Sequence, residues 1–393
     1  MLLENLRLHN FKNYKSSSLT FSPNLNFIFG ENGNGKTNLL ESISMLCYTK
    51  SFLQNSENEC LKYGEEGFEI SGQFKNAADS LNKIKLTYKN DTNEKEIFYD
   101  NEKVTAKNEF IGKFPLVVLS PKDTKLTTGS PQERRRNFDL LISQISRVYL
   151  RDLRSLNRVL KQKNSLLKSN LVNKRYSKTE LRDMIALWND EIIEYGVKIL
   201  IRRLDFIEGF RDYLLESFNK IVGSSYIPVI NYESDLLEMG LSETPDFDLI
   251  RSSFRELLDR KMDFEISRGI SMVGPQRDNY VFRMKKDGEL FDVRIFASQG
   301  EHKTFVVALK LSEFEYINDN LENSNTGKPI LLLDDVFSEL DKKRIKKISG
   351  ILTDYNQIFL TTTDYDYLNI LRDNFKSNFG AYQIINGEPQ FVN

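Results

Sequence analysis

The chain has 393 residues, of which 40% are hydrophobic and 28% charged, and its formal net charge at pH 7 is −1. This composition excludes a disordered chain and a uniformly basic nucleic-acid binder, so any site for a polyanion must be local. The two cysteines and two histidines provide no metal-ligand spacing, and no apolar run is long enough to cross a bilayer. We therefore expect a large cytoplasmic protein of two lobes that has no membrane contact.

Short apolar or alternating segments predict strands in the first part of the chain. The predicted strands are residues 2–8, 25–29, 68–74, 84–88, 96–99 and 114–119. The first two flank a turn at Ser22, Pro23 and Asn24. The next three show the alternation of antiparallel strands, and the last has the apolar character of a buried strand.

Residues 30–37 match the phosphate-binding pattern G-x-x-x-x-G-K-[ST] between a predicted strand and a predicted helix. A chance glycine-rich turn is the alternative, which this strand–loop–helix context disfavours. The glycines let backbone N–H groups surround phosphate oxygens, Lys36 neutralises the charge of the β- and γ-phosphates, and Thr37 offers a Mg²⁺ ligand. The predicted ATP-binding residues of this loop are Gly30, Glu31, Asn32, Gly33, Asn34, Gly35, Lys36, Thr37 and Asn38.

The middle of the chain, from Pro131 to about Val222 and again over residues 246–268, has helical periodicity. Between Pro131 and Glu180 there are thirteen basic residues against four acidic ones, a surplus of nine. Five of the basic residues recur in steps of four and three and therefore share one helix face: Arg147, Arg151, Arg154, Arg158 and Lys161. A solvated helix face is the alternative, but such faces usually mix charges of both signs. We predict that this basic ridge contacts DNA phosphates.

Sheet character resumes with a predicted hairpin of residues 280–284 and 291–296, and residues 298–301 follow with the sequence Ser-Gln-Gly-Glu. A helix is predicted from there to about Leu321. In one interpretation Ser298 and Glu301 form a capping box at its start. In the other, the Ser298 hydroxyl and the Gly300 N–H form an anion site that the chain's own P-loop phosphates are not expected to reach. Such a site would serve a second copy of the chain, and both interpretations remain open here.

Residues 330–333 are four consecutive aliphatics, which predict a strand buried on both faces of a parallel sheet. This strand delivers Asp334 and Asp335 to the carboxyl edge of the sheet. We predict that Asp334 holds Mg²⁺ and that Asp335 orients water for attack on the γ-phosphate; an ordinary core strand that ends in a solvated turn is the alternative. A further strand at residues 357–361 and a hairpin around Asn386 and Gly387 complete the predicted elements.

The order of these motifs resembles the RecF family, whose members are built on an SMC-like ABC ATPase head. The resemblance covers nearly the whole length. It is carried by residues 8–14, 30–41, 129–131 with Arg134, Arg135 and Arg136, 274–278, 298–301 and 331–341. In ABC-type ATPases a serine-glycine segment grips the γ-phosphate bound by the opposing subunit, and residues 338–341 look like the loop that such dimers press across their interface.

The resemblance implies an α/β fold, an ABC-type P-loop ATPase head whose mixed sheet has an antiparallel part and which is interrupted by a mainly helical second lobe. We expect the head in residues 1–128 and 271–393, and the helical lobe, which carries dimer and DNA contacts, in residues 129–270. An SMC protein would have hundreds of residues of heptad repeats at this place, and the insertion is too short for that.

The resemblance further implies an ATP-dependent DNA-binding protein of recombinational repair and replication. In this hypothesis two copies dimerise on ATP, clamp single-stranded or gapped DNA, help RecA to assemble with RecR and RecO as partners, and separate after slow hydrolysis. By analogy with related heads, Lys12 or Asn13 contacts the nucleotide from the side, and Asp123 lies in the loop that senses the γ-phosphate.

Three positions depart from the family pattern. Glu301 replaces a glutamine, Gln276 replaces a histidine, and Thr363 stands where ABC ATPases have the switch histidine. Threonine cannot relay a proton as imidazole can, so we expect weak, DNA-stimulated ATPase activity that serves as a switch. The ATPase subunit of a membrane transporter, or an NTPase that turns over without DNA, are the alternative functions.

Overall fold

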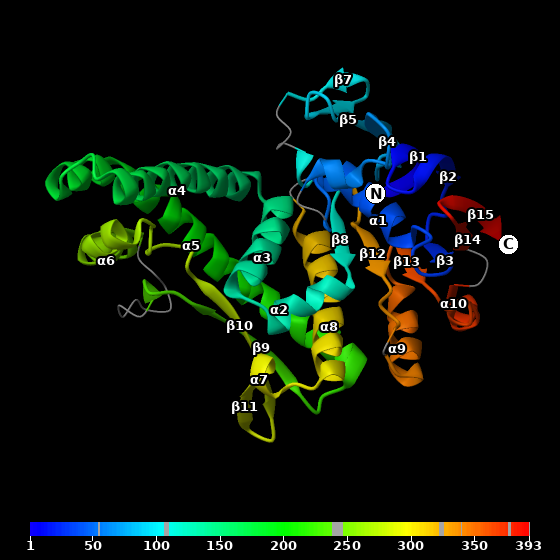
Figure 1. Cartoon of the computed structure of the whole chain (residues 1–393). Coiled ribbons are helices and arrows are strands. Elements are labelled where there is room, and N and C mark those ends of the chain that lie inside the picture. The colour runs from blue at the N-terminus through cyan, green and yellow to red at the C-terminus, as the bar shows by residue number, and fades with distance from the viewer. Residues whose placement is uncertain are drawn as a thin grey trace. The chain divides into compact units, whose positions relative to one another are not determined.

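The chain folds into two compact units in the computed structural model, which describes residues 1–53, 56–105, 110–237, 247–321, 326–338, 340–375 and 379–392 (Figure 1). The first, here called the head unit, comprises Met1–Thr124, Glu216–Tyr226 and Ala297–Asn393. The second, here called the helical unit, comprises Lys125–Leu215 and Ile227–Phe296. Both units are therefore assembled from segments that are distant in the sequence.

One sheet of the head unit is antiparallel, with the strand order β2-β1-β4-β5-β6-β7. Its strands are β1 (Leu2–Phe11), β2 (Tyr14–Thr20), β4 (Gly67–Lys75), β5 (Leu81–Lys89), β6 (Glu94–Tyr99) and β7 (Glu102–Lys103). Helix α1 (Lys36–Tyr48) packs against this sheet. Gly72 of β4 makes room for the helix, because a Cβ atom at this position would lie 2.7 Å from Leu46 Cδ1.

The second sheet of the head unit has the order β15-β14-β3-β13-β12-β8, and all its neighbouring strands are parallel except β14 and β15. The strands are β3 (Leu25–Phe29), β8 (Leu116–Leu119), β12 (Ile330–Asp334), β13 (Gln357–Thr362), β14 (Phe379–Ile385) and β15 (Glu388–Val392). Every residue of β3, β8, β12 and β13 is buried, as expected for parallel strands. The register places Asp334 opposite Thr361 and Phe29 opposite Thr362, so β3, β12 and β13 end at the same edge.

Helices and short helical turns complete the head unit. Within the described residues they are η1 (Glu57–Cys60), η3 (Pro121–Thr124), α8 (Gln299–Asn320), α9 (Lys342–Leu352) and α10 (Tyr367–Phe375), together with the last residues of α5 (Lys178–Val222). Helix α8 packs against β8 and η3, and α9 packs against α10. Helix α8 therefore contacts both β8 and the helical turn that follows it.

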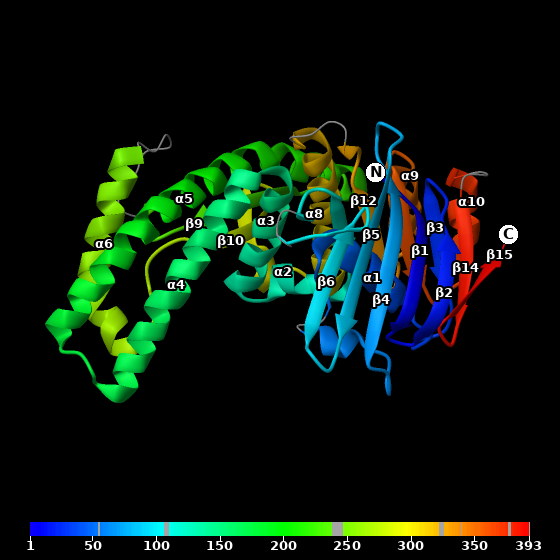
Figure 2. The same ribbon diagram turned by 90° about the horizontal axis from the view of Figure 1, so that it is seen from above.

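The helical unit contains α2 (Lys125–Thr128), α3 (Pro131–Ile145), α4 (Arg147–Asn173), most of α5, α6 (Phe247–Arg268) and α7 (Val293–Phe296). Its small sheet has the order β11-β10-β9, formed by β9 (Ile227–Glu233), β10 (Asn279–Lys286) and β11 (Glu289–Asp292). Figure 2 shows α4, α5 and α6 lying beside one another. Leu167 of α4 and Ile185 of α5 are buried in one apolar cluster, and Met262 of α6 packs against it.

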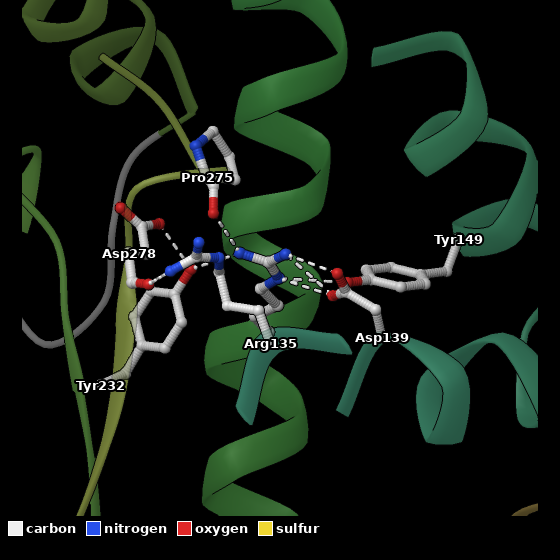
Figure 3. A network of polar contacts seen from close by, with 7 residues as sticks. Arg135, Asp139, Tyr149, Tyr232, Pro275 and Asp278 are labelled. Carbon is white, nitrogen blue, oxygen red and sulfur yellow. Dashed lines mark hydrogen bonds and ion pairs between the residues drawn. The ribbon is translucent and has the colours of Figure 1, made fainter. Parts of the chain in front are cut away.

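A buried arginine, Arg203 of α5, lies in the polar core of the helical unit. Its guanidinium donates to both carboxylate oxygens of Asp139, over 2.8 and 3.0 Å, and to the Pro275 carbonyl over 2.7 Å. The Tyr149 hydroxyl donates to the same Asp139 carboxylate over 2.5 Å (Figure 3). Because Arg203 is 1% exposed, these partners replace the water that a charged group would otherwise need.

The same network reaches Asp278, which the resemblance had singled out within residues 274–278. The Tyr232 hydroxyl donates to Asp278 Oδ2 over 2.5 Å, and the Arg135 guanidinium donates to the Asp278 carbonyl over 2.5 Å (Figure 3). Burial raises the pKa of the Asp278 carboxyl to about 6. This motif therefore joins α3, α5, β9 and the segment before β10 within one unit.

The predicted strands of the head unit and the long helical region are present in the structure, but the hairpin differs from the prediction. Residues 291–296 were predicted as a strand, which is wrong: β11 ends at Asp292, and α7 occupies Val293–Phe296. The Asp292 carboxylate accepts from the Arg294 N–H over 2.8 Å and thereby caps this helical turn. Strands β2, β7 and β9 were not predicted.

The compact units also divide the chain at other points than the predicted segments 1–128, 129–270 and 271–393. Residues 271–296 belong to the helical unit, because β10 pairs with β9 and packs against α3. Residues 216–226, at the end of α5, belong to the head unit, where Phe218 contacts Phe305 of α8.

Candidate nucleotide-binding site

The glycines of the P-loop are required by what surrounds them. Gly30 has φ +151°, and a Cβ atom there would lie 2.5 Å from the Ile384 carbonyl oxygen of β14. Gly35 has φ +109°, and a Cβ atom there would lie 2.5 Å from Asn13 Nδ2. A side chain at either position would push the loop away from its neighbours, so the observed path of the loop requires glycine at both positions.

Segments from both ends of the chain brace this loop. Asn13 donates to the Asn34 carbonyl over 2.7 Å and accepts from the Asn38 side chain over 2.9 Å. The Tyr14 hydroxyl donates to the Gly35 carbonyl over 2.9 Å, and the Gly387 N–H donates to the Asn34 carbonyl over 3.0 Å. Asn13, predicted as a nucleotide contact, therefore has a structural role in holding the loop.

Lys36 lies against the loop that precedes it. Its ammonium donates to the carbonyl oxygens of Gly30 and Glu31 over 2.8 and 2.9 Å. Burial lowers the pKa of Lys36, and the nearby Asp335 and Asp334 carboxylates oppose this shift. A phosphate group that enters the loop can replace these carbonyls as the acceptor of the lysine.

Asp334, at the end of β12, meets the start of α1. The Thr37 hydroxyl donates to Asp334 Oδ1 over 2.8 Å, and the Thr361 hydroxyl donates to the same oxygen over 2.7 Å. Burial raises the pKa of Asp334, and these two hydrogen bonds oppose the rise. A carboxylate and a hydroxyl side by side form the hard oxygen donor set that suits Mg²⁺ together with phosphates.

Asp335 follows in a left-handed backbone conformation with φ +50°. Its N–H donates to the Thr361 carbonyl over 3.2 Å and to the Thr361 hydroxyl over 3.0 Å. A small cavity beside both aspartates is also lined by Ser120, Pro121 and Lys303. This places a second carboxylate next to the proposed metal ligand, with space beside it.

Lys12 is held by the buried carboxylate of Glu41, which was not predicted as a site residue. Its ammonium lies 3.5 Å from Glu41 Oε2, and Glu41 of α1 is fully buried. The Ser51 hydroxyl donates to the other oxygen of this carboxylate, and the Cys60 thiol lies 3.6 Å from it. Lys12 therefore lies next to α1, at Glu41, which is four positions after Thr37 in the sequence.

Asp123 lies in η3, directly after β8. Its carboxylate accepts from the Ser120 N–H over 2.6 Å and from the Ser120 hydroxyl over 2.9 Å. Its second oxygen lies 3.9 Å from the buried Lys310 ammonium of α8. The loop predicted to sense the γ-phosphate is thus linked to the helix that begins after Ser298.

Ser298 forms the capping box that one interpretation of the sequence predicted. Its hydroxyl accepts from the Glu301 N–H over 3.4 Å, and the Glu301 carboxylate accepts from the Ser298 N–H over 2.8 Å and from its hydroxyl over 2.7 Å. In the anion-site interpretation the N-terminus of α8 would attract a phosphate, and this phosphate would compete with the Glu301 carboxylate for the Ser298 hydroxyl.

The start of α8 is close to the segment predicted as the interface loop. The Lys303 ammonium donates to the Ser338 carbonyl over 2.8 Å, and a Cβ atom at Gly300 would lie 3.6 Å from the Arg344 guanidinium. The Asp341 carboxylate accepts from the Arg344 N–H over 2.9 Å and caps α9. Glu339, which belongs to the same predicted loop, lies outside the described residues.

The basic ridge is a feature of α4 in the helical unit. Arg147, Arg151, Arg158 and Lys161 are exposed and Arg154 is half-buried, whereas Tyr149, Leu156 and Leu160 of the opposite face are buried. Two ion pairs accompany it: Arg151 lies 3.6 Å from the buried Asp152, and the exposed Arg158 lies 3.9 Å from the exposed Glu191.

The surplus of nine charges between Pro131 and Glu180 overstates what this surface carries. Lys163 is fully buried and pairs with Glu265 over 2.5 Å. Arg134 and Arg135 donate to Asn279 and to the Asp278 carbonyl inside the helical unit. These three cations serve the interior, which sequence spacing alone could not reveal.

Four residues that brace or complete the site were not predicted as site residues: Tyr14, Glu41, Thr361 and Gly387. Tyr14 and Glu41 stood within segments that carried the family resemblance, and Thr361 and Gly387 stood only in a predicted strand and hairpin. Thr363, which replaces the switch histidine, is exposed after the end of β13. None of the helices within the described ranges is both long and apolar enough to cross a membrane.

Residues 2–386 of the chain match the family model described as the RecF/RecN/SMC N terminal domain. The DNA replication and repair protein RecF of Chloroherpeton thalassium is 36% identical over 368 residues, which cover 93% of this chain and 95% of that protein. These matches agree with the family that the motifs indicated.

Two solved structures extend the likeness to the fold. A structure of the recombination mediator protein RecF-ATP in the RecFOR pathway is 30% identical, has a TM-score of 0.83, and covers 100% of this chain and 97% of that one. A structure of the SmcHead bound to the C-winged helix domain of ScpA is 14% identical with a TM-score of 0.57, covers 100% of this chain and 97% of that one, and is similar in fold alone. The predicted fold class, an ABC-type ATPase head interrupted by a helical lobe, is confirmed.

Proposed function

Because the chain belongs to the RecF family of SMC-type ATPase heads, we propose that it is an ATP-dependent DNA-binding protein of replication and recombinational repair. The observation that carries this proposal is the hydrogen bond between Thr37 and Asp334, which joins the P-loop helix to the acidic end of β12. A relative described as RecF-ATP, which this chain covers almost completely, supports ATP as the nucleotide.

In this proposal the P-loop from Gly30 to Asn38 holds the phosphates, and Lys36 exchanges its carbonyl acceptors for phosphate oxygens. Thr37 and Asp334 would hold Mg²⁺, since their oxygens form a suitable donor set. The ion, when bound, neutralises charge on the phosphates. Asp335 orients the attacking water, and Lys12 or Asn13 contacts the nucleotide from the side.

A second copy of the chain completes the site. Ser298 and Gly300 at the start of α8 cap the γ-phosphate held by the opposing copy, so ATP promotes dimerisation. The Glu301 carboxylate, which accepts from the Ser298 hydroxyl over 2.7 Å, competes with the phosphate for that donor. Dimerisation is therefore weaker than it would be with a neutral side chain at position 301.

DNA contact is assigned to the basic ridge of α4, which is exposed along most of its length. Two ridges brought together by dimerisation would hold single-stranded or gapped DNA through its phosphates, without reading the bases. The RecFOR pathway named for the solved relative supports RecR and RecO as partners. The loading of RecA as the task enters this proposal through the family resemblance alone. We place the protein in the cytoplasm.

Hydrolysis in this proposal is slow and DNA-stimulated, and it releases the clamp. The presence of Thr363 supports slow hydrolysis, because a hydroxyl cannot take up and return a proton as histidine does. The transporter alternative is not favoured, since the matching relatives are DNA replication and repair proteins. An NTPase without DNA dependence differs from the proposal only in its response to DNA.

Sizing the protein by sedimentation with ATP, with ADP and without nucleotide, each with and without gapped duplex DNA, tests the proposal. We expect dimers with ATP and monomers with ADP, and we expect DNA to favour the dimer. The variant Lys36→Ala is the control, since it should stay monomeric with ATP. A monomer under all six conditions would refute the clamp. A separate measurement of ATP hydrolysis with and without DNA tests the alternative, and a rate unaffected by DNA would favour the NTPase without DNA dependence.

A further inference from the structure

Thr361 lies at the end of β13, next to both acidic residues of the nucleotide site. It is 1% exposed, and the parallel pairing of β12 with β13 places it opposite Asp334. Its hydroxyl donates to Asp334 Oδ1 over 2.7 Å and accepts from the Asp335 N–H over 3.0 Å. A hydroxyl has one donor and two acceptor positions, so this single side chain serves both residues at once.

The bond to Asp334 is independent of the other partner of that carboxylate. Asp334 Oδ1 also accepts from the Thr37 hydroxyl over 2.8 Å, but the Thr37 oxygen is itself a proposed magnesium ligand. The Thr361 hydroxyl, by contrast, is not a magnesium ligand in the proposed function. Because Asp334 is 4% exposed, water cannot easily replace a lost donor, and the carboxylate would be left less well oriented.

The bonds to Asp335 hold its backbone in an uncommon conformation. Its φ of +50° lies in the left-handed region, which non-glycine residues rarely adopt. The Asp335 N–H donates both to the hydroxyl and, over 3.2 Å, to the carbonyl of Thr361. One residue therefore fixes the peptide from which the second carboxylate projects.

We propose that Thr361 is the positioning residue of this site: its hydroxyl orients Asp334 for magnesium and holds the backbone of Asp335. This inference rests on the proposed function and deepens it, since it names a residue that acts through the two acids. Loss of the hydroxyl should raise the magnesium concentration that the protein needs to retain ATP, whereas the nucleotide still binds at saturating magnesium.

The structure offers a matched control on the same strand. Thr362, the next residue, is also 1% exposed, and its hydroxyl accepts from the Asp364 N–H over 3.1 Å. Its side chain is on the opposite face of the strand from that of Thr361, as follows from the period of two. Replacing either threonine by valine removes one buried hydroxyl and keeps the branched shape.

The experiment titrates MgCl₂ against the full-length chain with a fluorescent ATP analogue, in wild type, Thr361→Val, Thr361→Ser and Thr362→Val. We expect the magnesium midpoint of Thr361→Val to rise about 10- to 100-fold, as for other residues that orient a metal ligand. Thr361→Ser retains the hydroxyl and should stay within about threefold of wild type. Thr362→Val should match wild type, and thermal unfolding reports whether each variant is folded.

An unchanged midpoint in Thr361→Val would overturn the inference, as would equal shifts in Thr361→Val and Thr362→Val. If Thr361→Val does not fold, Thr361→Ala is compared with Thr361→Ser by the same titration and with the same expected difference. A wild type that retains no nucleotide at any magnesium concentration would overturn the proposed function, and the inference with it. Retention by wild type with no shift in the variants would overturn the inference alone.

Discussion

The Thr37 hydroxyl donates a hydrogen bond of 2.8 Å to Asp334 across 297 positions of the sequence. The bond joins the first turn of α1 to the last residue of β12, so the two predicted halves of the nucleotide site meet in one head unit. Predictions about this site can therefore be tested on single residues from either half.

Replacing Lys36 by alanine should weaken ATP binding about 10- to 100-fold, because the variant loses a charge-assisted bond to phosphate. The ammonium now donates to the Gly30 and Glu31 carbonyls, which solvent can satisfy in the variant. Equilibrium binding of a fluorescent ATP analogue measures the loss. Lys15→Ala, at an exposed position of β2, is the control, and equal affinity in the two variants would contradict the phosphate assignment.

Two replacements of Ser298 separate a helix cap from a phosphate site. Ser298→Ala removes the cap of α8 and should cost about 1 kcal/mol of stability, whereas Ser298→Asp keeps a good cap but places a negative charge where phosphate would bind. We expect both variants to bind ATP as monomers and neither to dimerise. Sedimentation with ATP measures this, and an aspartate variant that dimerises like wild type would show that Ser298 is a cap alone.

Replacing Glu301 by glutamine should strengthen ATP-dependent dimerisation. Glutamine preserves the capping box but removes the charge that competes for the Ser298 hydroxyl. The protein concentration at half-association should fall about two- to fivefold, the effect of one charge at a helix N-terminus. Glu289→Gln, an exposed acid of β11, serves for comparison. A weaker dimer in Glu301→Gln would mean that the carboxylate assists the contact.

Replacing Arg151, Arg154 and Arg158 together by glutamine should flatten the dependence of DNA affinity on salt. If all three contact duplex phosphates, the slope of log K against log salt should fall by about 2 to 3. Fluorescence anisotropy with labelled DNA at several salt concentrations measures it. Lys342, Lys343 and Lys346 of α9 are exposed and supply a control of equal charge in the head unit. Equal slopes for both triple variants would leave the ridge without a specific role.

Asp278 should make the helical unit less stable as the pH rises. Its pKa is raised to about 6 by burial, and Arg203 and Arg135 oppose this rise, so its contribution to stability is full below pH 4 and is lost as pH rises through 6. The free energy of unfolding of wild type should fall by about 1 kcal/mol between pH 5 and pH 7 through this group, and that of Asp278→Asn should not. The difference between the two proteins should therefore shift by about 1 kcal/mol in favour of the variant over this range.

Urea unfolding at several pH values measures this difference for Asp278→Asn. The variant Asp259→Asn, at an exposed position of α6, is the control and should show no such trend. A constant difference between Asp278→Asn and wild type across this range would show that the Asp278 carboxyl does not titrate there.

The sequence predicted the parts of the site that depend on local pattern. The P-loop, the buried strand before Asp334 and the capping box at Ser298 all lie within a few consecutive residues, so spacing was enough. Thr361 and Gly387 contribute through strand register and a distant hairpin, as when β12 pairs with β13 to set Thr361 opposite Asp334. No periodicity within one segment contains that information.

The bounds of the compact units differ from those of the predicted segments for a similar reason. β9 contains Pro228 and becomes part of the sheet only through its pairing with β10, which begins at Asn279. The charge count of the basic segment exceeds the charge at its surface, because some of its cations are buried. Lys163 has the same residue type as its exposed neighbours, yet it is paired internally with Glu265.

The Gly387 N–H, from the hairpin between β14 and β15, donates to the Asn34 carbonyl of the P-loop. In chain order the loop precedes this brace, and α1 and strands β4 to β14 lie between them. A chain from which β14 and β15 were removed would lack both Gly387 and the strand that contacts Gly30, so the loop would lose both contacts. The conformation of the P-loop is in this way coupled to the formation of the β14–β15 hairpin.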